Sequence, residues 1–275
     1  SQKNLKLRFM VNRIKNIFLS KNKVLTTFIT AGDPNLKITQ KILEKLSDSG
    51  ADILEIGMPF SDPMADGPTI QLSSSRAIKN QTGLEDIFLL SKNFRKKNKK
   101  KPIILMGYYN PIHYYGNKKF VDKCVSSEID GIIVVDLQPE NDGELSNLCK
   151  KNKIEFIRLL TPTTNSNRLK SILKNASGFL YYVSVKGTTG QKTAKIKDLK
   201  ISIKEIKKKT NLPVLVGFGI KSAEMARKVS KISDGVIVGT SIIKYIENFI
   251  LKKTTLQKTY KDISRFVSSL SKGMN

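Results

Sequence analysis

The stretch ADILEIGMPFSDPMADGPTI, residues 51–70, runs from an apolar strand pattern into a polar, proline-rich loop. Its first half is nearly continuously apolar, as expected of a parallel strand that is covered on both faces. Side chains alternate across a strand, so Ile53, Glu55 and Gly57 share one face and the apolar residues between them share the other. That second set suits packing under helices. The pattern therefore predicts that Glu55 points into the interior of a barrel.

Seven more apolar runs of this kind occur along the chain. The eight candidate strands are 24–32, 51–59, 102–109, 131–137, 154–161, 178–185, 213–219 and 235–241. Amphipathic helix patterns lie among them, at about 10–19, 37–49, 167–176 and 256–271.

Eight strands that alternate with helices, without a linker-like break, predict an α/β fold. We expect a single (β/α)8 TIM barrel domain over residues 1–275, with an extra N-terminal helix and a short helix after strand 8. An open doubly wound sheet is the alternative, but no G-x-G-x-x-G motif follows the first strand. In such barrels the functional site lies at the carboxyl ends of the strands.

The chain is strongly basic, with 49 Lys and Arg residues against 23 Asp and Glu residues and a net charge of +26. A nucleic-acid binder is one reading, because basic surfaces attract phosphate backbones. Composition bias is the other, since Lys, Asn and Ile are enriched together and Lys greatly outnumbers the Arg that base readers prefer. We favour the second reading and expect no nucleic-acid partner.

Several features bear on the compartment. Cys124 and Cys149 match no metal or disulfide spacing. No apolar run is long enough for a membrane span, and the start SQKNLKLRFM lacks the apolar core of a signal peptide. We therefore expect a cytoplasmic protein that does not interact with a membrane, or a stromal one if the gene is plastid-encoded.

Two carboxylates near the second strand are the main catalytic candidates. A carboxyl buried without a partner has a raised pKa, which suits Glu55 to acid–base chemistry near neutral pH. Asp66 lies in a loop fixed by prolines and glycine and is expected to stay ionised, so that the two groups divide acid and charge-stabilising roles. A structural Glu55 paired with a buried cation is the alternative. Asp62 is either a turn former or a partner contact.

Glycine-rich elements follow three late strands, at 187–190 (GTTG), 217–219 (GFG) and 239–241 (GTS). Each alone could be a tight turn. Together, at one barrel edge, they predict a phosphate site, because barrel enzymes bind phosphate in these loops and at the start of an extra helix. Thr240 is placed to cap that helix or to donate to the phosphate.

Apolar and aromatic residues near strand ends could line a pocket for a planar ligand, although some of them suit the barrel core equally well. They are Phe28, Met106, Tyr108, Ile133, Tyr181 and Phe218. The single histidine, His113, has no companion ligands, so we expect no metal site.

The chain resembles the α subunits of tryptophan synthase. LEIGMPFSDPMADGPTIQ, residues 54–71, is similar to the signature of that family, LE-[IL]-G-x-PFSDPxADGPxIQ. The resemblance extends in register from about residue 12 to 270 and also covers FITAGDP, LMGYYNPI, VVDLQPE, YYVSVKGTTG, VGFGI and VGTSIIK.

This resemblance implies a lyase of tryptophan biosynthesis that cleaves indole-3-glycerol phosphate to indole and glyceraldehyde 3-phosphate. It implies acid–base catalysis by Glu55, contact of Asp66 with the indole nitrogen, and Tyr181 beside them. The implied phosphate-binding residues are Gly190, Gly219, Gly239 and Thr240. The implied indole pocket consists of Phe28, Met106, Tyr108, Ile133 and Phe218.

The resemblance further implies a β subunit that carries pyridoxal phosphate and receives the indole, in an α2β2 heterotetramer, and no cofactor in this chain. The implied contact surface comprises the 136–140 segment and Pro59, Phe60, Asp62, Pro63 and Asn110. A mobile lid is implied at 187–198, after Lys186. A stand-alone indole-3-glycerol phosphate lyase with the same site is the alternative function.

Three positions depart from the family pattern. Gln138 replaces a usual proline in the contact segment, and Thr240 replaces the commoner serine, which conserves a hydroxyl. Lys192 stands where the lid usually has arginine, which weakens any inference about a bidentate contact there.

Overall fold

In the computed structural model, which describes residues 12–184 and 192–274, nine short strands form one parallel sheet. They are β1 (Val24–Thr30), β2 (Ile53–Gly57), β3 (Ile103–Gly107), β4 (Gly131–Val134), β5 (Glu155–Phe156), β6 (Arg158–Leu160), β7 (Leu180–Val183), β8 (Val214–Gly217) and β9 (Gly235–Val238).

The sheet closes into a barrel through β5 and β6. Their order in the sheet is β5-β4-β3-β2-β1-β9-β8-β7-β6, so β5 and β6 stand at its two ends. Only Ile157 separates them, and its N–H donates to the Ile132 carbonyl at 3.0 Å. The two form one interrupted strand that pairs with β4 on one side and β7 on the other. Eight strand units therefore make the barrel, which confirms the predicted fold.

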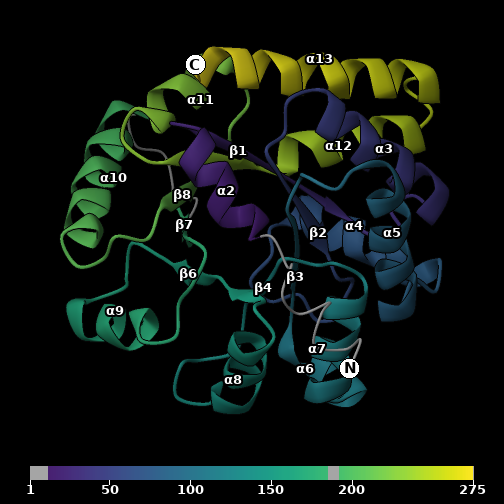
Figure 1. Cartoon of the computed structure of the whole chain (residues 1–275). Coiled ribbons are helices and arrows are strands. Elements are labelled where there is room, and N and C mark those ends of the chain that lie inside the picture. Colours follow the sequence, from purple (N-terminus) through teal and green to yellow (C-terminus); the bar gives the residue numbers. More distant parts are fainter. Residues whose placement is uncertain (1–11, 185–191, 275) are drawn as a thin grey trace.

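Helices surround the barrel (Figure 1). They are α2 (Arg13–Ser20), α3 (Leu36–Asp48), α4 (Pro68–Lys79), α5 (Leu84–Lys97), α6 (Tyr109–Tyr115), α7 (Asn117–Ser126), α8 (Gly143–Lys151), α9 (Ser166–Leu173), α10 (Lys192–Lys207), α11 (Ala223–Ser230), α12 (Thr240–Ile250) and α13 (Leu256–Met274). The extra N-terminal helix is α2, and the extra helix after the last strand is α12, as predicted.

The barrel interior is one apolar layer, and α2 closes its amino end. Ile14 of α2 is 1% exposed and belongs to the same buried cluster as Ile53 and Ile133 on the inner strand faces. A Cβ on Gly131 would lie 2.7 Å from Ile157 Cδ1 and 3.3 Å from Ile14 Cδ1, so the glycine leaves room for both side chains. Figure 1 shows α2 near the centre of the ring of helices.

A second apolar layer lies between the strands and the helices. In α13, Ile263, Val267 and Leu270 are fully buried, as the stripe in the sequence predicts. Burying each such side chain stabilises the fold by about 1.5–3 kcal/mol. No helix in the described ranges is long and apolar enough to span a bilayer.

A buried ion-pair cluster secures the amino end of the barrel. Asp130, just before β4, accepts from Arg95 of α5 at 2.6 Å and from Arg13 of α2 at 2.9 Å. It also accepts from the Ile103 N–H at 2.8 Å. The cluster joins α2, α5, β3 and β4 at the end opposite to the candidate site.

Candidate active site

Glu55 points into the barrel, as strand alternation predicts. Its neighbour Ile53 belongs to the interior cluster, whereas Leu54 and Ile56 belong to the layer under the helices. Glu55 is completely buried, and neither carboxyl oxygen has a hydrogen-bond partner among residues 12–184 and 192–274.

The surroundings of Glu55 favour its protonated form. Burial raises its pKa to about 8, and the negative charge of Asp66 raises it in the same direction. The structure places no cation against it, so the alternative of a structural ion pair has no support among the described residues. A carboxyl with a pKa near 8 is protonated at neutral pH and can both donate and recover a proton.

Asp66 lies in the loop between β2 and α4, with Tyr108 beside it. Burial raises the pKa of Asp66 to about 6, while a hydrogen bond from the Tyr108 hydroxyl lowers it. The same hydroxyl accepts from the Ala65 N–H at 3.0 Å. At neutral pH Asp66 is therefore mainly ionised and Glu55 mainly protonated, although burial raises the pKa of Asp66, which the polar loop in the sequence does not predict.

Tyr181 of β7 completes this group from the opposite side of the barrel. Burial raises the pKa of its hydroxyl, and the charges of Glu55 and Asp66 raise it further, so all three groups lie within electrostatic range. A Cβ on Gly217 would lie 2.8 Å from the Tyr181 ring and 2.9 Å from its hydroxyl. Glycine in β8 therefore lets the tyrosine lie across that strand.

Phe28 of β1 lies next to Glu55, since these two residues are partners in the register of β1 and β2. A Cβ on Gly57 would lie 2.6 Å from Phe28 Cζ, and one on Gly239 would lie 3.0 Å from Phe28 Cδ1. The ring therefore occupies space that both glycines leave open, between Glu55 and the start of α12.

A small cavity opens at the carboxyl ends of β1 to β4. Its volume is about 20 Å³, and it is lined by Phe28, Thr30, Gly57, Met58, Asp66, Ile70, Ser74, Met106, Gly107, Tyr108 and Val135. That is room for about one water molecule, so a larger ligand requires these side chains to move.

Besides Tyr181, two residues of the implied indole pocket lie outside this lining. Ile133 pairs in register with Met106 and is buried in the interior cluster. Phe218 follows β8 and packs, partly buried, against the layer under the helices. The structure therefore does not bring Phe218 to the cavity, because alternation along β8 turns Gly217 rather than Phe218 inward.

The predicted phosphate residues lie at the start of α12 and in the loop after β8. Thr240 begins α12, and Gly239 is its N-cap without a side-chain hydrogen bond, so the first-turn N–H groups lack a side-chain cap. Gly219 has φ +61°, and a Cβ there would meet nothing within 4 Å. Ser241 Oγ donates to the Ile220 carbonyl at 2.6 Å, which joins the two segments. Gly190 lies outside the described residues.

The predicted contact surface lies on the same barrel end. The Phe60 ring stacks on Tyr108, with centroids 5.2 Å apart. Asp62 and Asn110 are exposed, and Pro59 and Pro63 are half-buried. The part of this surface from Pro59 to Pro63 therefore shares one loop with Asp66, whereas Asn110 lies in α6. Lys186 and the side chain of Lys192 lie outside the described part of the chain.

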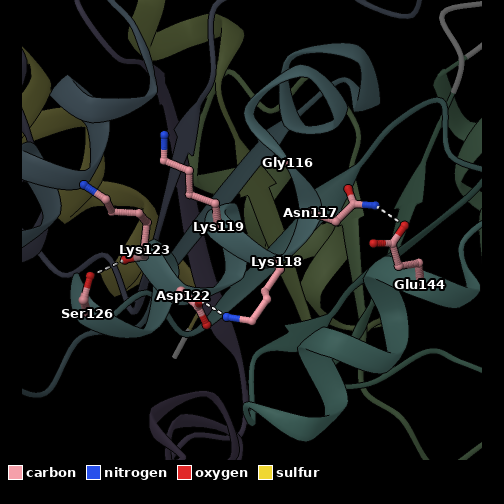
Figure 2. Close-up of a pocket in the computed structure, with 8 residues that line it drawn as sticks. All are labelled: Gly116, Asn117, Lys118, Lys119, Asp122, Lys123, Ser126 and Glu144. Carbon is pink, nitrogen blue, oxygen red and sulfur yellow. Dashed lines mark hydrogen bonds and ion pairs between the residues drawn. The ribbon is translucent and has the colours of Figure 1, made fainter.

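A larger hollow of about 610 Å³ lies along α7 (Figure 2). Lys118 and Lys123 in its lining are paired with Asp122 and Glu85, and Asn117 donates to Glu144. None of the candidate site residues lines it. Across residues 12–184 and 192–274, no group of three or more His, Cys, Asp or Glu side chains is placed to hold a metal ion.

Sequence reasoning missed the residues that hold the Asp66 loop in place. Asp33 accepts from Arg76 and Ser73, and Ser74 bonds to the Phe60 backbone. Asp33 and Arg76 are 43 residues apart, and no local pattern joins them. An aspartate directly after a buried strand, within FITAGDP, is the only signal in the sequence.

Comparison with known proteins places this site in a family. A family model described as "Tryptophan synthase alpha chain" matches residues 14–273. The chain belongs to the tryptophan synthase alpha chain family. Its reaction is that of a lyase in tryptophan biosynthesis, the cleavage of indole-3-glycerol phosphate to indole and glyceraldehyde 3-phosphate.

Individual members of the tryptophan synthase alpha chain family match over nearly their whole length. The protein from Geotalea daltonii is 43% identical over 268 residues, which cover 96% of this chain and 99% of the relative. The one from Zymomonas mobilis is 43% identical over 270 residues, which cover 95% and 98%. The crystal structure of the α subunit from Legionella pneumophila has a TM-score of 0.87 at 39% identity and covers 96% of this chain and 98% of its own.

Proposed function

We propose that Glu55 is the single acid–base group of the cleavage reaction. The observation that carries this role is a fully buried carboxyl that has no hydrogen-bond partner in the described part of the chain and lies within electrostatic range of Asp66 and Tyr181. Because its pKa is about 8, it holds a proton that it can give to the substrate.

The reaction needs two proton transfers at neighbouring atoms. Glu55 donates its proton to indole C3, which leaves a positive charge on the indole ring. The resulting carboxylate then removes the proton from the adjacent side-chain hydroxyl. As that hydroxyl becomes the aldehyde carbonyl, the bonding pair between the side chain and C3 returns to the ring. Indole and glyceraldehyde 3-phosphate are released, and Glu55 is again protonated.

Asp66 stabilises the charge that develops during this sequence. Protonation at C3 places positive charge on the indole nitrogen, and a carboxylate that is already ionised and fixed stabilises it without reorganisation. Tyr108 supports this state, because its hydrogen bond lowers the pKa of Asp66. Tyr181 lies beside both groups as a third polar contact.

The remaining substrate contacts follow from position. The phosphate group would bind at the uncapped start of α12, through the segments that contain Gly190, Gly219, Gly239 and Thr240. The indole ring would lie among Phe28, Met106 and Tyr108, above Ile133. Phe218 can join this pocket only if the loop after β8 turns its ring toward the cavity.

The experiment that tests this function is an indole-release assay on the purified chain with indole-3-glycerol phosphate. Activity that disappears in a Glu55 variant supports the assigned role, and the variant is described in the Discussion.

Substitution of Tyr108 by phenylalanine is expected to lower kcat/KM about tenfold at pH 7. The variant loses the hydrogen bond that lowers the pKa of Asp66, so this pKa rises. Because the reaction needs ionised Asp66, the acid limb of the pH profile of kcat/KM should move to higher pH.

Tyr109→Phe is the matched control for this variant. The hydroxyl of Tyr109 accepts from Asn117 Nδ2 at 2.9 Å and does not contact Asp66. Its removal should leave the acid limb in place. An unchanged profile in Tyr108→Phe would contradict the role of the Tyr108 hydroxyl.

We further propose that this chain works in the cytoplasm beside a tryptophan synthase β subunit, in an α2β2 heterotetramer. Pyridoxal phosphate would belong to that partner, and this chain would hold no cofactor of its own. Support comes from family membership and from exposed residues at the barrel mouth, among them Asp62 and Asn110.

Replacement of Asp62 by alanine is expected to raise the β-subunit concentration needed for half-maximal indole release about tenfold. Asp62 is exposed, and within the described ranges its carboxylate accepts only from the neighbouring Ser61 Oγ, at 2.6 Å, so it is available to a partner cation. Glu205→Ala, on the opposite end of the barrel and paired with Lys208, is the control. If added β subunit leaves the turnover of the natural chain unchanged, this chain acts as a stand-alone indole-3-glycerol phosphate lyase.

A further inference from the structure

Asp33 is a buried carboxylate at the carboxyl end of β1 that the proposed chemistry does not use. Its side chain has no exposed area. Ser73 Oγ donates to it at 2.5 Å, and Arg76 donates from Nε and Nη2 at 2.7 Å each. Burying a carboxylate is costly unless it is paired and hydrogen-bonded, so the three residues form a built arrangement, here called the Asp33 cluster.

The Asp33 cluster joins α4 to the loop after β1. Ser73 and Arg76 are three residues apart on α4 and therefore share one helix face. Asn80, four residues further on, donates Nδ2 to the carbonyls of Gly32, at 3.2 Å, and Pro34. Ser73 and Arg76 of α4 and its C-cap Asn80 are thus all bonded to residues 32–34.

The position of α4 in turn determines the position of Asp66. The helix begins two residues after it, at Pro68, and Gln71 Nε2 donates to the Asp66 carbonyl at 2.8 Å. Ser74 Oγ accepts from the Phe60 N–H at 2.9 Å and lies 3.0 Å from the Phe60 carbonyl. The loop that carries Asp66 is therefore attached to α4 near both of its ends.

The cluster also reaches two other parts of the site. Phe28 and Thr30 of β1 line the same cavity as Asp66, and Asp33 follows them by a few residues. The negative charge of Glu247 in α12 acts on Arg76, so α4 also faces the helix whose first turn is the proposed phosphate site.

We propose that Asp33 and Arg76 are positioning residues for the cleavage reaction. Their ion pair fixes α4 against the end of β1 and thereby holds the Asp66 carboxylate in place relative to Glu55. The inference rests on the role proposed for Asp66.

The test measures kcat and KM for indole-3-glycerol phosphate in Asp33→Asn. This variant keeps the shape of the side chain but removes the charge that binds Arg76. We expect kcat to fall about ten- to hundredfold, because small displacements of catalytic groups have effects of this size. KM should change little. Arg76→Lys keeps the positive charge and one hydrogen bond to Asp33, so its loss in kcat should be smaller than that of Asp33→Asn.

Ser73→Ala is the second variant, for the case in which Asp33→Asn does not fold. It removes one donor and leaves the bidentate pair intact, so we expect a smaller fall in kcat with the same unchanged KM. Asp130→Asn is the matched control for stability. It removes a buried carboxylate that binds Arg95 and Arg13 at the other end of the barrel. It should lower resistance to urea without changing the kcat of the folded protein.

The Asp66→Asn background separates the possible outcomes. If the cluster acts through Asp66, Asp33→Asn adds no further loss of kcat there, since residues that act as a unit are not additive. If the losses of the two single variants multiply in the double variant, the proposal for Asp33 and Arg76 is wrong. It is also wrong if Asp33→Asn has a normal kcat while Asp66→Asn is impaired. In both cases the role of Asp66 itself stands. Full activity of Asp66→Asn would overturn the role of Asp66 itself and, with it, this inference.

Discussion

Glu55→Gln is expected to reduce indole release by about 10²- to 10⁴-fold, the range attributed to a lost acid–base group. Glutamine has nearly the same shape but can neither protonate indole C3 nor accept the hydroxyl proton. Both proton transfers depend on this one carboxyl, so the loss should lie at the upper end of the range. The measurement is kcat for indole-3-glycerol phosphate with saturating β subunit.

The fold should survive this substitution, because neither oxygen of Glu55 has a hydrogen-bond partner to lose among the residues that the structure describes. Circular dichroism and binding of glyceraldehyde 3-phosphate should be those of the natural chain. A variant that is folded and fully active would show that another group transfers the protons.

The same variant should be more stable than the natural chain at pH 8. The pKa of Glu55 is about 8 in the folded chain and near its ordinary value of 4.5 when unfolded. Between these values the folded state holds a proton that the unfolded state has released, so stability falls as pH rises through this window. The loss is on the order of 5 kcal/mol once pH has risen above both pKa values.

Urea denaturation at pH 5 and pH 8 checks this prediction. Glu55→Gln lacks the titrating group, so its advantage over the natural chain should be small at pH 5 and should grow toward pH 8. Glu205→Gln is the control, because Lys208 holds the pKa of this carboxyl below its usual range. Glu205→Gln should not be more resistant to urea than the natural chain at pH 8. An equal pH dependence in Glu55→Gln and the natural chain would place the Glu55 pKa near its ordinary value.

Much of the barrel could be predicted from local patterns. Continuous apolar runs give the strands, and alternation alone turns Glu55 inward, because the helices cover only one face of β2. The stripe on α13 predicts its buried face in the same way.

Other features depend on contacts between distant segments. The bond between Asp33 and Arg76 spans 43 residues, with α3 and β2 between them, so nothing in either local sequence indicates it. The orientation of Phe218 depends on the exact position of β8, which ends at Gly217. Because side chains alternate along a strand, a shift of one residue would turn Phe218 inward in place of Gly217. The break at Ile157 within the predicted strand 154–161 depends likewise on the pairing of β5 and β6 with different neighbours.

The helix α2 determines the route by which molecules can enter and leave the barrel interior. Ile14 fills the amino end, so in the described part of the chain the space around Glu55 can exchange molecules with the outside only past the carboxyl ends of the strands. Substrate entry and the departure of both products then share a single mouth. A partner seated on the rim formed by Phe60, Asp62 and Asn110 would stand directly over that exit. It would receive the departing indole without any passage through the barrel wall.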